Sequence, residues 1–183
     1  MSIKDMSIKV EPLKKKDKKQ TLEFFYKTIT DSFKTEGLFE LGMTDTCKHE
    51  INNQEKRISS SIRSGTPYYL LAKDKNLVVG TIAFGRPGKA IEKAFLQLNK
   101  SSNGVVEIFS SFVLPEYQRK GIGSLLFKAV KEEIVKRGYR LFAVNTGYKK
   151  GLKFWGEKLG KPSITLKKYY YPIDCYVWIK EIR

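Results

Sequence analysis

The chain has 183 residues, 41% hydrophobic and 13% aromatic, which excludes an intrinsically disordered protein and suffices for one domain with a buried core. Lys and Arg number 35 against 19 Asp and Glu, which gives a net charge of +16. No stretch approaches the roughly 18 consecutive apolar residues of a membrane span, so we expect no membrane partner. The positive charge can attract nucleic acid. Because few arginines cluster and no nucleic-acid motif accompanies the charge, we expect no such partner and ascribe it to abundant lysine and an anionic ligand.

Hydrophobic periodicity and turn residues predict strands and helices along the chain. Residues 8–13 alternate apolar and polar side chains, as an edge strand does, and a proline at position 12 falls near its end. Two helices are predicted over 17–36 and 44–63, and a glycine follows each of them. The later elements predicted in this way are strands 67–73 and 77–85 around a hairpin turn, a short helix at 90–98, strand 105–114 and helix 122–137; strand 139–145, a helix ending near 160 and a closing strand at 176–182 are implied by the family resemblance described below.

This order, β-α-α-β-β-(α)-β-α-β-α-β-β, predicts a mixed α/β sheet with helices on both faces. No internal repeat or flexible linker divides the chain, so we expect a single domain over residues 1–183. Residues 87–103 are expected to form an insert between two strands, and we allow for disorder in residues 1–7.

The two cysteines, Cys47 and Cys175, stand far apart and form no redox motif. His49 lies close to Cys47 and Glu50, but without a second such pair this cluster is typical of a helix surface, so we predict no metal site. The N-terminus lacks the basic and apolar regions of a secretory signal. These observations favour a reduced, cytoplasmic protein.

The most informative stretch is residues 105–123, which reads as an apolar strand, a stop at Pro115, and the turn 118–123 (Gln-Arg-Lys-Gly-Ile-Gly) before an amphipathic helix. A glycine turn at a helix start presents unpaired backbone N–H groups at the positive end of the helix dipole, where phosphate or pyrophosphate binds. The dinucleotide fingerprint Gly-x-Gly-x-x-Gly and the phosphate loop Gly-x-x-x-x-Gly-Lys-Ser/Thr are both absent, which argues against those nucleotide-binding classes.

Residues 113–126 (Val-Leu-Pro-Glu-Tyr-Gln-Arg-Lys-Gly-Ile-Gly-Ser-Leu-Leu) resemble the acyl-CoA-binding signature of the GCN5-related N-acetyltransferases (GNAT). In that family an apolar strand precedes Pro-x-x-Gln/Arg-x-x-Gly-x-Gly/Ala and a helix. Residues 139–145 resemble the family's next strand, 154–160 its helix with an aromatic-x-x-x-Leu-Gly end, and 176–182 its closing strand. The resemblance implies a mixed, mostly antiparallel sheet of about seven strands flanked by helices on both faces.

The resemblance also implies acetyl-CoA as co-substrate. Backbone N–H groups of the glycine turn are expected to bind its pyrophosphate, because glycine has no Cβ to prevent a close approach. The preceding strand is expected to pair with the pantetheine arm and to be irregular at Ser110 or Ser111. The residues assigned to acetyl-CoA are Phe112, Val113, Gln118, Arg119, Lys120, Gly121, Ile122, Gly123, Ser124 and, at the end of the next strand, Asn145. For Phe112 and Val113 simple strand packing is the alternative role.

Acetyl transfer to a protonated amine needs a base, because an ammonium ion has no lone pair with which to attack. Glu107 is the candidate, since a carboxylate within the apolar strand 105–109 is costly without a purpose. In the family a glutamate at this distance before the glycine turn acts as base, directly or through water. The alternative is a structural ion pair. We predict an N-acetyltransferase in which a primary amine attacks directly in a ternary complex, with Glu107 as general base.

The leaving coenzyme A thiolate must take up a proton. The family commonly provides it from the tyrosine of a Phe-Tyr pair, but this chain has Phe154-Trp155 there, and an indole is not a useful acid. Tyr148 is the nearby candidate, with an ordinary aromatic surface or cleft role as its alternative, and release without a protein acid is also open. The missing tyrosine leaves a second function open, an acyl-CoA-binding regulatory module on the same fold without turnover.

No signature marks the acceptor pocket, so the acceptor is expected to be a small molecule or a peptide that carries an amine. The positive charge disfavours polycationic acceptors. The tyrosine run 169–171 is expected to pack in a strand and turn, with the lining of the acceptor cleft as an alternative role. The oligomeric state is left as monomer or homodimer.

Overall fold

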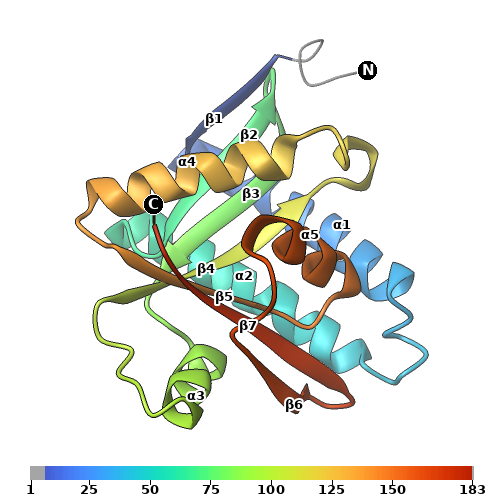
Figure 1. Cartoon of the computed structure of the whole chain (residues 1–183). Helices are drawn as coiled ribbons and strands as arrows, with labels where there is room; N and C mark the ends of the chain where they lie inside the picture. The colour runs from blue at the N-terminus through green and yellow to red at the C-terminus, as the bar shows by residue number, and fades with distance from the viewer. Residues whose placement is uncertain (1–6, 183) are drawn as a thin grey trace. The chain divides into compact units, whose positions relative to one another are not determined.

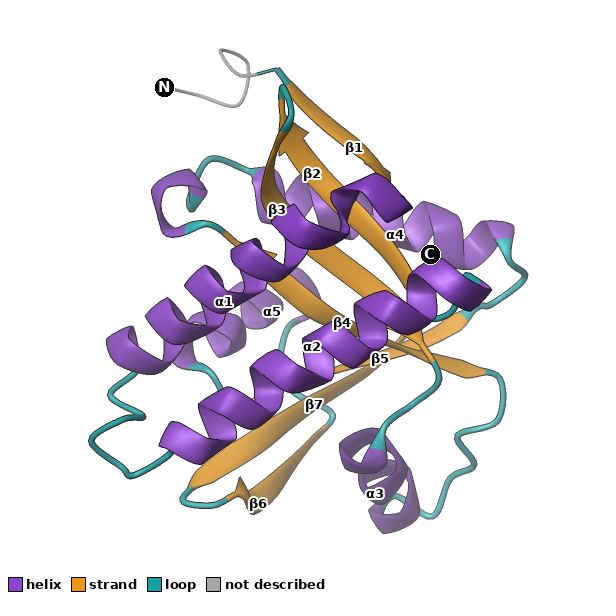
Figure 2. Ribbon diagram, turned by 180° about the vertical axis from the view of Figure 1, so that it is seen from behind, coloured by secondary structure: helices purple, strands orange, loops and turns teal. Residues whose placement is uncertain are grey.

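The computed structural model describes residues 7–182, so the expected disorder of residues 1–7 falls, apart from Ser7, outside the described residues. Within this range the elements follow in the predicted order, with two short 3₁₀ turns in addition (Figures 1 and 2). The strands are β1 (Ile8–Pro12), β2 (Tyr68–Asp74), β3 (Leu77–Gly85), β4 (Val105–Val113), β5 (Leu141–Thr146), β6 (Ile164–Tyr170) and β7 (Ile173–Glu181). The helices are α1 (Lys18–Thr35), α2 (Thr44–Ser64), α3 (Lys89–Gln97), α4 (Ile122–Lys136) and α5 (Lys149–Leu159).

The seven strands of the described chain form one sheet in the order β1-β2-β3-β4-β5-β7-β6. Antiparallel pairs join β1 to β2, β2 to β3, β5 to β7 and β6 to β7. The pair β4–β5 is parallel, with Val105–Ile108 in register with Leu141–Val144. The predicted mixed, mostly antiparallel sheet of about seven strands is confirmed.

The chain divides into two compact units that interleave in sequence. The first comprises residues up to 84 and 110–132, and the second comprises 85–109 and the residues from 133 onward. Strand β4 and helix α4 each continue from one unit into the other. The predicted insert 87–103 lies in the second unit and contains α3, while the expected single domain over residues 1–183 stays a prediction.

In the first unit, helices cover both faces of the strands. On one face the ring of Phe25 in α1 meets the ring of Tyr69 in β2 edge-on, with 6.3 Å between centroids. On the other face α4 packs closely on β3, because a Cβ on Gly80 would lie 2.9 Å from Cδ1 of Leu126. Tyr69 pairs with Ala83, three residues from Gly80, and the alternation of a strand directs these two positions to opposite faces.

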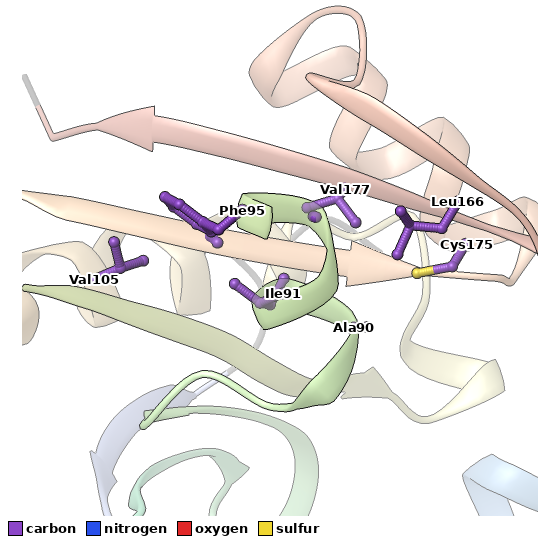
Figure 3. Packing of buried hydrophobic residues seen from close by; sticks show 9 residues of the cluster. Ala90, Ile91, Phe95, Val105, Leu166, Cys175 and Val177 are labelled. Carbon is purple, nitrogen blue, oxygen red and sulfur yellow. The ribbon is translucent and has the colours of Figure 1, made fainter. Parts of the chain in front are cut away.

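In the second unit, α3 and α5 also lie on opposite faces. Figure 3 shows the apolar side of α3 against β5, β6 and β7. The buried members of this cluster are Ala90, Ile91, Ala94, Phe95, Val105, Ala143, Leu166, Cys175 and Val177. The next residue of β7, Trp178, points the other way, and its indole N–H donates to the carbonyl of Gly160 at the end of α5 (2.8 Å).

Strand β5 begins two residues later than predicted. The backbone N–H of Tyr139 donates to the carbonyl of Ile134, and the N–H of Gly138 donates to that of Val135, so these groups close the C-terminus of α4. The strand therefore begins at Leu141, after the helix cap has used the N–H of Tyr139.

Candidate functional site

Strand β4 is interrupted in the first unit by a left-handed residue, Ser110. Its φ is +50°, a conformation that an L-residue rarely adopts within a strand and that marks a bulge. Its hydroxyl donates to Oε1 of Gln54 (2.7 Å), and its carbonyl accepts from the hydroxyl of Thr81 (2.7 Å). The irregular point predicted at Ser110 or Ser111 is therefore confirmed at Ser110.

The partners of Ser110 form a buried polar cluster. Oε1 of Gln54 also accepts from the hydroxyl of Tyr69 (3.0 Å), which lies 3.1 Å from that of Ser110, and the amide of Gln54 donates to Glu50 (2.7 Å). Burial raises the pKa of Tyr69, so its phenol stays protonated and can donate. The cluster ties β4 to α2 and β2. Sequence reasoning missed Gln54, although it occupies an apolar-periodic position of α2 between Cys47 and Ile58.

The glycine turn adopts the geometry of an anion-binding loop. Arg119 (φ +58°) and Gly121 (φ +88°) are both left-handed, and α4 begins at the next residue. Left-handed residues in a turn gather successive backbone N–H groups on one side, and the first turn of a helix adds further unpaired N–H groups. The side-chain amide of Gln118 donates to the carbonyl of Val113 (3.1 Å), which fixes the turn against the end of β4.

The residues of this loop fit a pyrophosphate through their main chain. Ile122 is 1% exposed, so only its backbone can contribute, whereas Gly123 and Ser124 are half-buried at the helix start. The ammonium of Lys120 donates a hydrogen bond to the carbonyl of Glu116 (2.6 Å), which places a positive charge on the loop. The loop thus combines main-chain donors, a helix N-terminus and a cation.

A buried carboxylate lies on the second-unit part of β4. Glu107 is 7% exposed; its Oε2 accepts from the backbone N–H of Gly88 (2.5 Å) and its Oε1 from Nδ2 of Asn145 (2.7 Å). Gly88 is the N-cap of α3, so the carboxylate also faces the positive end of that helix. Both donors are neutral.

The amide of Asn145 continues this chain of hydrogen bonds. Its Oδ1 accepts from the hydroxyl of Tyr170 (2.8 Å) and lies 3.6 Å from the thiol of Cys175. Burial, with a contribution from Glu107, raises the pKa of Cys175 to about 12. Burial first, and then the nearby Cys175 and Glu107, raise the pKa of Tyr170. Both groups are therefore neutral donors near pH 7.

Sequence reasoning did not find the roles of Tyr170 and Cys175, since a tyrosine run and a lone cysteine carry no site signal. The assignment of Asn145 to acetyl-CoA stays a prediction. Its side-chain amide bonds Glu107 and Tyr170.

Comparison with protein families gives one decisive match. The model of the acetyltransferase (GNAT) family matches residues 26–160, which include both the glycine turn and Glu107. The chain belongs to this family. Family membership confirms the resemblance found in residues 113–126. The GNAT family uses acetyl-CoA as co-substrate, in agreement with the co-substrate expected from the sequence.

Solved GNAT structures share the fold at low sequence identity. The PaiA N-acetyltransferase of Thermoplasma acidophilum, in complex with coenzyme A, is 15% identical with a TM-score of 0.65, over 96% of this chain and 100% of that one. An N-acetyltransferase of Staphylococcus aureus Mu50 is 18% identical (TM-score 0.61, 97% and 99% covered). The yncA protein of Salmonella typhimurium, with its cofactor acetyl-CoA, is 14% identical (TM-score 0.64, 97% and 95% covered). No curated protein matches the chain.

Trp155 stands at the position where GNAT proteins commonly have the tyrosine that acts as acid, and it is a buried, packed side chain. Trp155 is 3% exposed and meets the ring of Phe154 edge-on at 4.9 Å. Tyr148 is the N-cap of α5, is half-buried, and donates its backbone N–H to the hydroxyl of Thr146 (3.1 Å). These contacts place Tyr148 at the carboxyl end of β5, but its role as an acid stays a prediction.

Within residues 7–182 no group of three or more His, Cys, Asp or Glu could hold a metal ion. Cys47 and Cys175 are both free thiols and buried. None of the helices in the described range is both long and apolar enough to span a bilayer.

Proposed function

We propose that this GNAT protein is an N-acetyltransferase that moves the acetyl group of acetyl-CoA to a primary amine. The amine attacks directly in a ternary complex, with Glu107 as general base. The observation that carries this proposal is a carboxylate at 7% exposure on β4 that accepts hydrogen bonds from Gly88 and Asn145. A carboxylate kept in an apolar strand by such partners is suited to accept a proton.

The donor site in this proposal belongs to the strand and turn of the family signature. Main-chain N–H groups from Gln118 to Ser124 bind the pyrophosphate, and Arg119 and Lys120 add positive charge. Phe112 and Val113 offer main-chain groups to the pantetheine arm; the ring of Phe112 packs on Phe25 (5.8 Å), so its backbone is the part available. When bound, acetyl-CoA supplies the acetyl thioester.

The chain's own residues then manage two protons. Glu107 takes the proton that the amine nitrogen must lose to form the amide, directly or through one water. Tyr148 donates the proton that the leaving thiolate takes up. It thereby replaces the tyrosine that the family commonly has at the position of Trp155 in this chain.

The experiment that tests the base compares Glu107→Gln with Glu92→Gln, an exposed glutamate of α3 in the same unit. Thiol release from acetyl-CoA is measured over a panel of primary amines, with mass spectrometry of the products. Loss of the base should lower kcat about 10²- to 10⁴-fold, whereas the control should keep its activity. Lines that intersect in two-substrate kinetics indicate a ternary complex, and parallel lines would contradict direct attack.

The burial of Trp155 where the family commonly has an acid favours one alternative, an acyl-CoA-binding regulatory module without turnover. That function predicts tight coenzyme A binding, no acetylated product from any amine, and indifference to Glu107→Gln. Product formation from even one amine excludes it.

The remaining parts of the proposal concern setting and partners. We infer a small-molecule or peptide amine as acceptor, no nucleic-acid or membrane partner, and a monomer or homodimer. Two free cysteines fit the reduced, cytoplasmic setting expected from the sequence.

A further inference from the structure

The donors and acceptors around Glu107 fix the direction in which its chain of hydrogen bonds runs. An ionised carboxylate can only accept, so the amide nitrogen of Asn145 faces Glu107 and its oxygen faces away. That oxygen can only accept as well. The hydroxyl of Tyr170 must therefore donate into it, as the 2.8 Å contact shows. The hydroxyl of Tyr170 therefore supports the orientation of the amide that the carboxylate requires.

We propose that Asn145 and Tyr170 are positioning residues for Glu107. Asn145 keeps the carboxylate ionised and aimed by donating to Oε1, and Tyr170 holds the Asn145 amide in the orientation that allows this. The proposal rests on the proposed function, in which Glu107 is the base. It assigns to the Asn145 side chain a task different from contact with acetyl-CoA.

The other groups near Glu107 come from three elements. From β6, Tyr169 lies close enough for Glu107 and Glu92 to raise its pKa, although burial is the larger cause. From β7, Cys175 shares the oxygen of Asn145. From α3, the ammonium of Lys93 lies 5.4 Å above the ring of Tyr169, and Lys89 follows the N-cap Gly88. These charges remain in place in the variants below, so a change in titration reports the hydrogen-bond chain itself.

Removal of either positioning group should disfavour the ionised carboxylate. Asn145→Leu deletes the donor to Oε1 and keeps the branching and the number of heavy atoms of the side chain. Tyr170→Phe leaves the weakly donating thiol of Cys175 on Oδ1, so the amide is held less firmly in the orientation that donates to the carboxylate. In both variants Glu107 should hold its proton to higher pH.

The test follows the carboxyl carbon of Glu107 by ¹³C NMR across a pH titration of the full chain labelled at glutamate; Glu107→Gln identifies the signal. The midpoint should rise by about one pH unit in Asn145→Leu, the loss of one hydrogen bond to a charge, and by about half a unit in Tyr170→Phe. The matched control is Tyr171→Phe, the exposed neighbour at 77%, which should leave the midpoint unchanged.

Coenzyme A titrations of the same variants separate the two roles of Asn145. Unchanged affinity with a raised midpoint supports positioning. Weakened affinity with an unmoved midpoint assigns the side chain to the pantetheine arm and overturns the proposal, and an unmoved midpoint in a folded Tyr170→Phe protein overturns it as well. If Glu107→Gln retains full turnover, the proposed base fails, but the NMR midpoints still decide the positioning roles.

Discussion

Ser110 is held in a backbone conformation that costs an L-residue energy, and the surrounding polar groups compensate. Its hydroxyl meets Gln54 and Tyr69, and its carbonyl meets Thr81. These contacts come from α2, β2 and β3, all in the first unit. The left-handed backbone of Ser110 is therefore supported by single side chains from three elements.

Substitutions at Ser110 should separate backbone strain from the lost hydroxyl. Ser110→Ala and Ser110→Gly both remove the hydroxyl, but only alanine keeps a Cβ at φ +50°. Alanine should therefore lower the free energy of unfolding by about 1–2 kcal/mol more than glycine does. Urea unfolding measures this difference, with the same pair of changes at Ser111 as control. Equal losses for the two variants at position 110 would show that the backbone there is not strained.

At the scale of the elements, α4 has a left-handed glycine at each end. Gly121 (φ +88°) precedes its first turn and Gly138 (φ +82°) follows its last. Both positions tolerate a side chain poorly, but only the N-terminal one presents backbone N–H groups of the kind that bind anions. The two ends of one helix therefore provide a matched comparison of binding and stability.

Gly121→Val and Gly138→Val should destabilise the protein to a similar degree, because each places a β-branched residue at positive φ. Only Gly121→Val should weaken coenzyme A binding, by about tenfold or more, which corresponds to roughly 1.4 kcal/mol. Calorimetric titration with coenzyme A and urea unfolding give the two quantities. Equal affinities in the two variants would exclude the turn as the pyrophosphate site.

At the scale of the whole molecule, charge is unbalanced, with 35 Lys and Arg against 19 Asp and Glu. Acid removes negative charge and increases self-repulsion. One ion cluster pairs opposite charges within this positively charged molecule. The ammonium of Lys73, which is little exposed, bonds the carboxylates of Asp17 (2.8 Å) and Glu11 (2.7 Å). The hydrogen bond from Lys73 lowers the pKa of Glu11. Burial works against the charge of Lys73, but its bonds to the two carboxylates outweigh burial and raise its pKa.

These shifts set a pH window for the cluster. The depressed pKa of Glu11 gives stability that is present above its ordinary value of 4.5 and lost as pH falls through the folded value. The raised pKa of Lys73 gives stability that is present below pH 10.5 and lost as pH rises through the folded value.

Lys73→Met leaves buried Asp17 without its cation and should lower the free energy of unfolding by about 3 kcal/mol at pH 7. Thermal unfolding should show that this loss shrinks in acid; a loss independent of pH would assign it to packing.

The sequence by itself determined the features that depend on residues close together along the chain. Period and turn residues predicted the element order as far as α4, because apolar spacing selects helix or strand locally, and the family resemblance implied the rest. The turn 118–123 and the carboxylate of Glu107 stood out for the same local reason, a glycine pattern and a charge in an apolar strand. Boundaries were less certain: β5 starts at Leu141 rather than 139, since the cap of α4 uses the N–H of Tyr139.

Only the tertiary structure decided which side chains meet. The hydrogen bond from Ser110 to Gln54 spans 56 residues, that from Asn145 to Glu107 spans 38, and that from Tyr170 to Asn145 spans 25. No periodic pattern encodes such pairs, because strand register and helix packing bring them together. Gln54, Tyr170 and Cys175 therefore met their partners only when the sheet was assembled, whereas the pattern of the glycine turn lies within its own six residues.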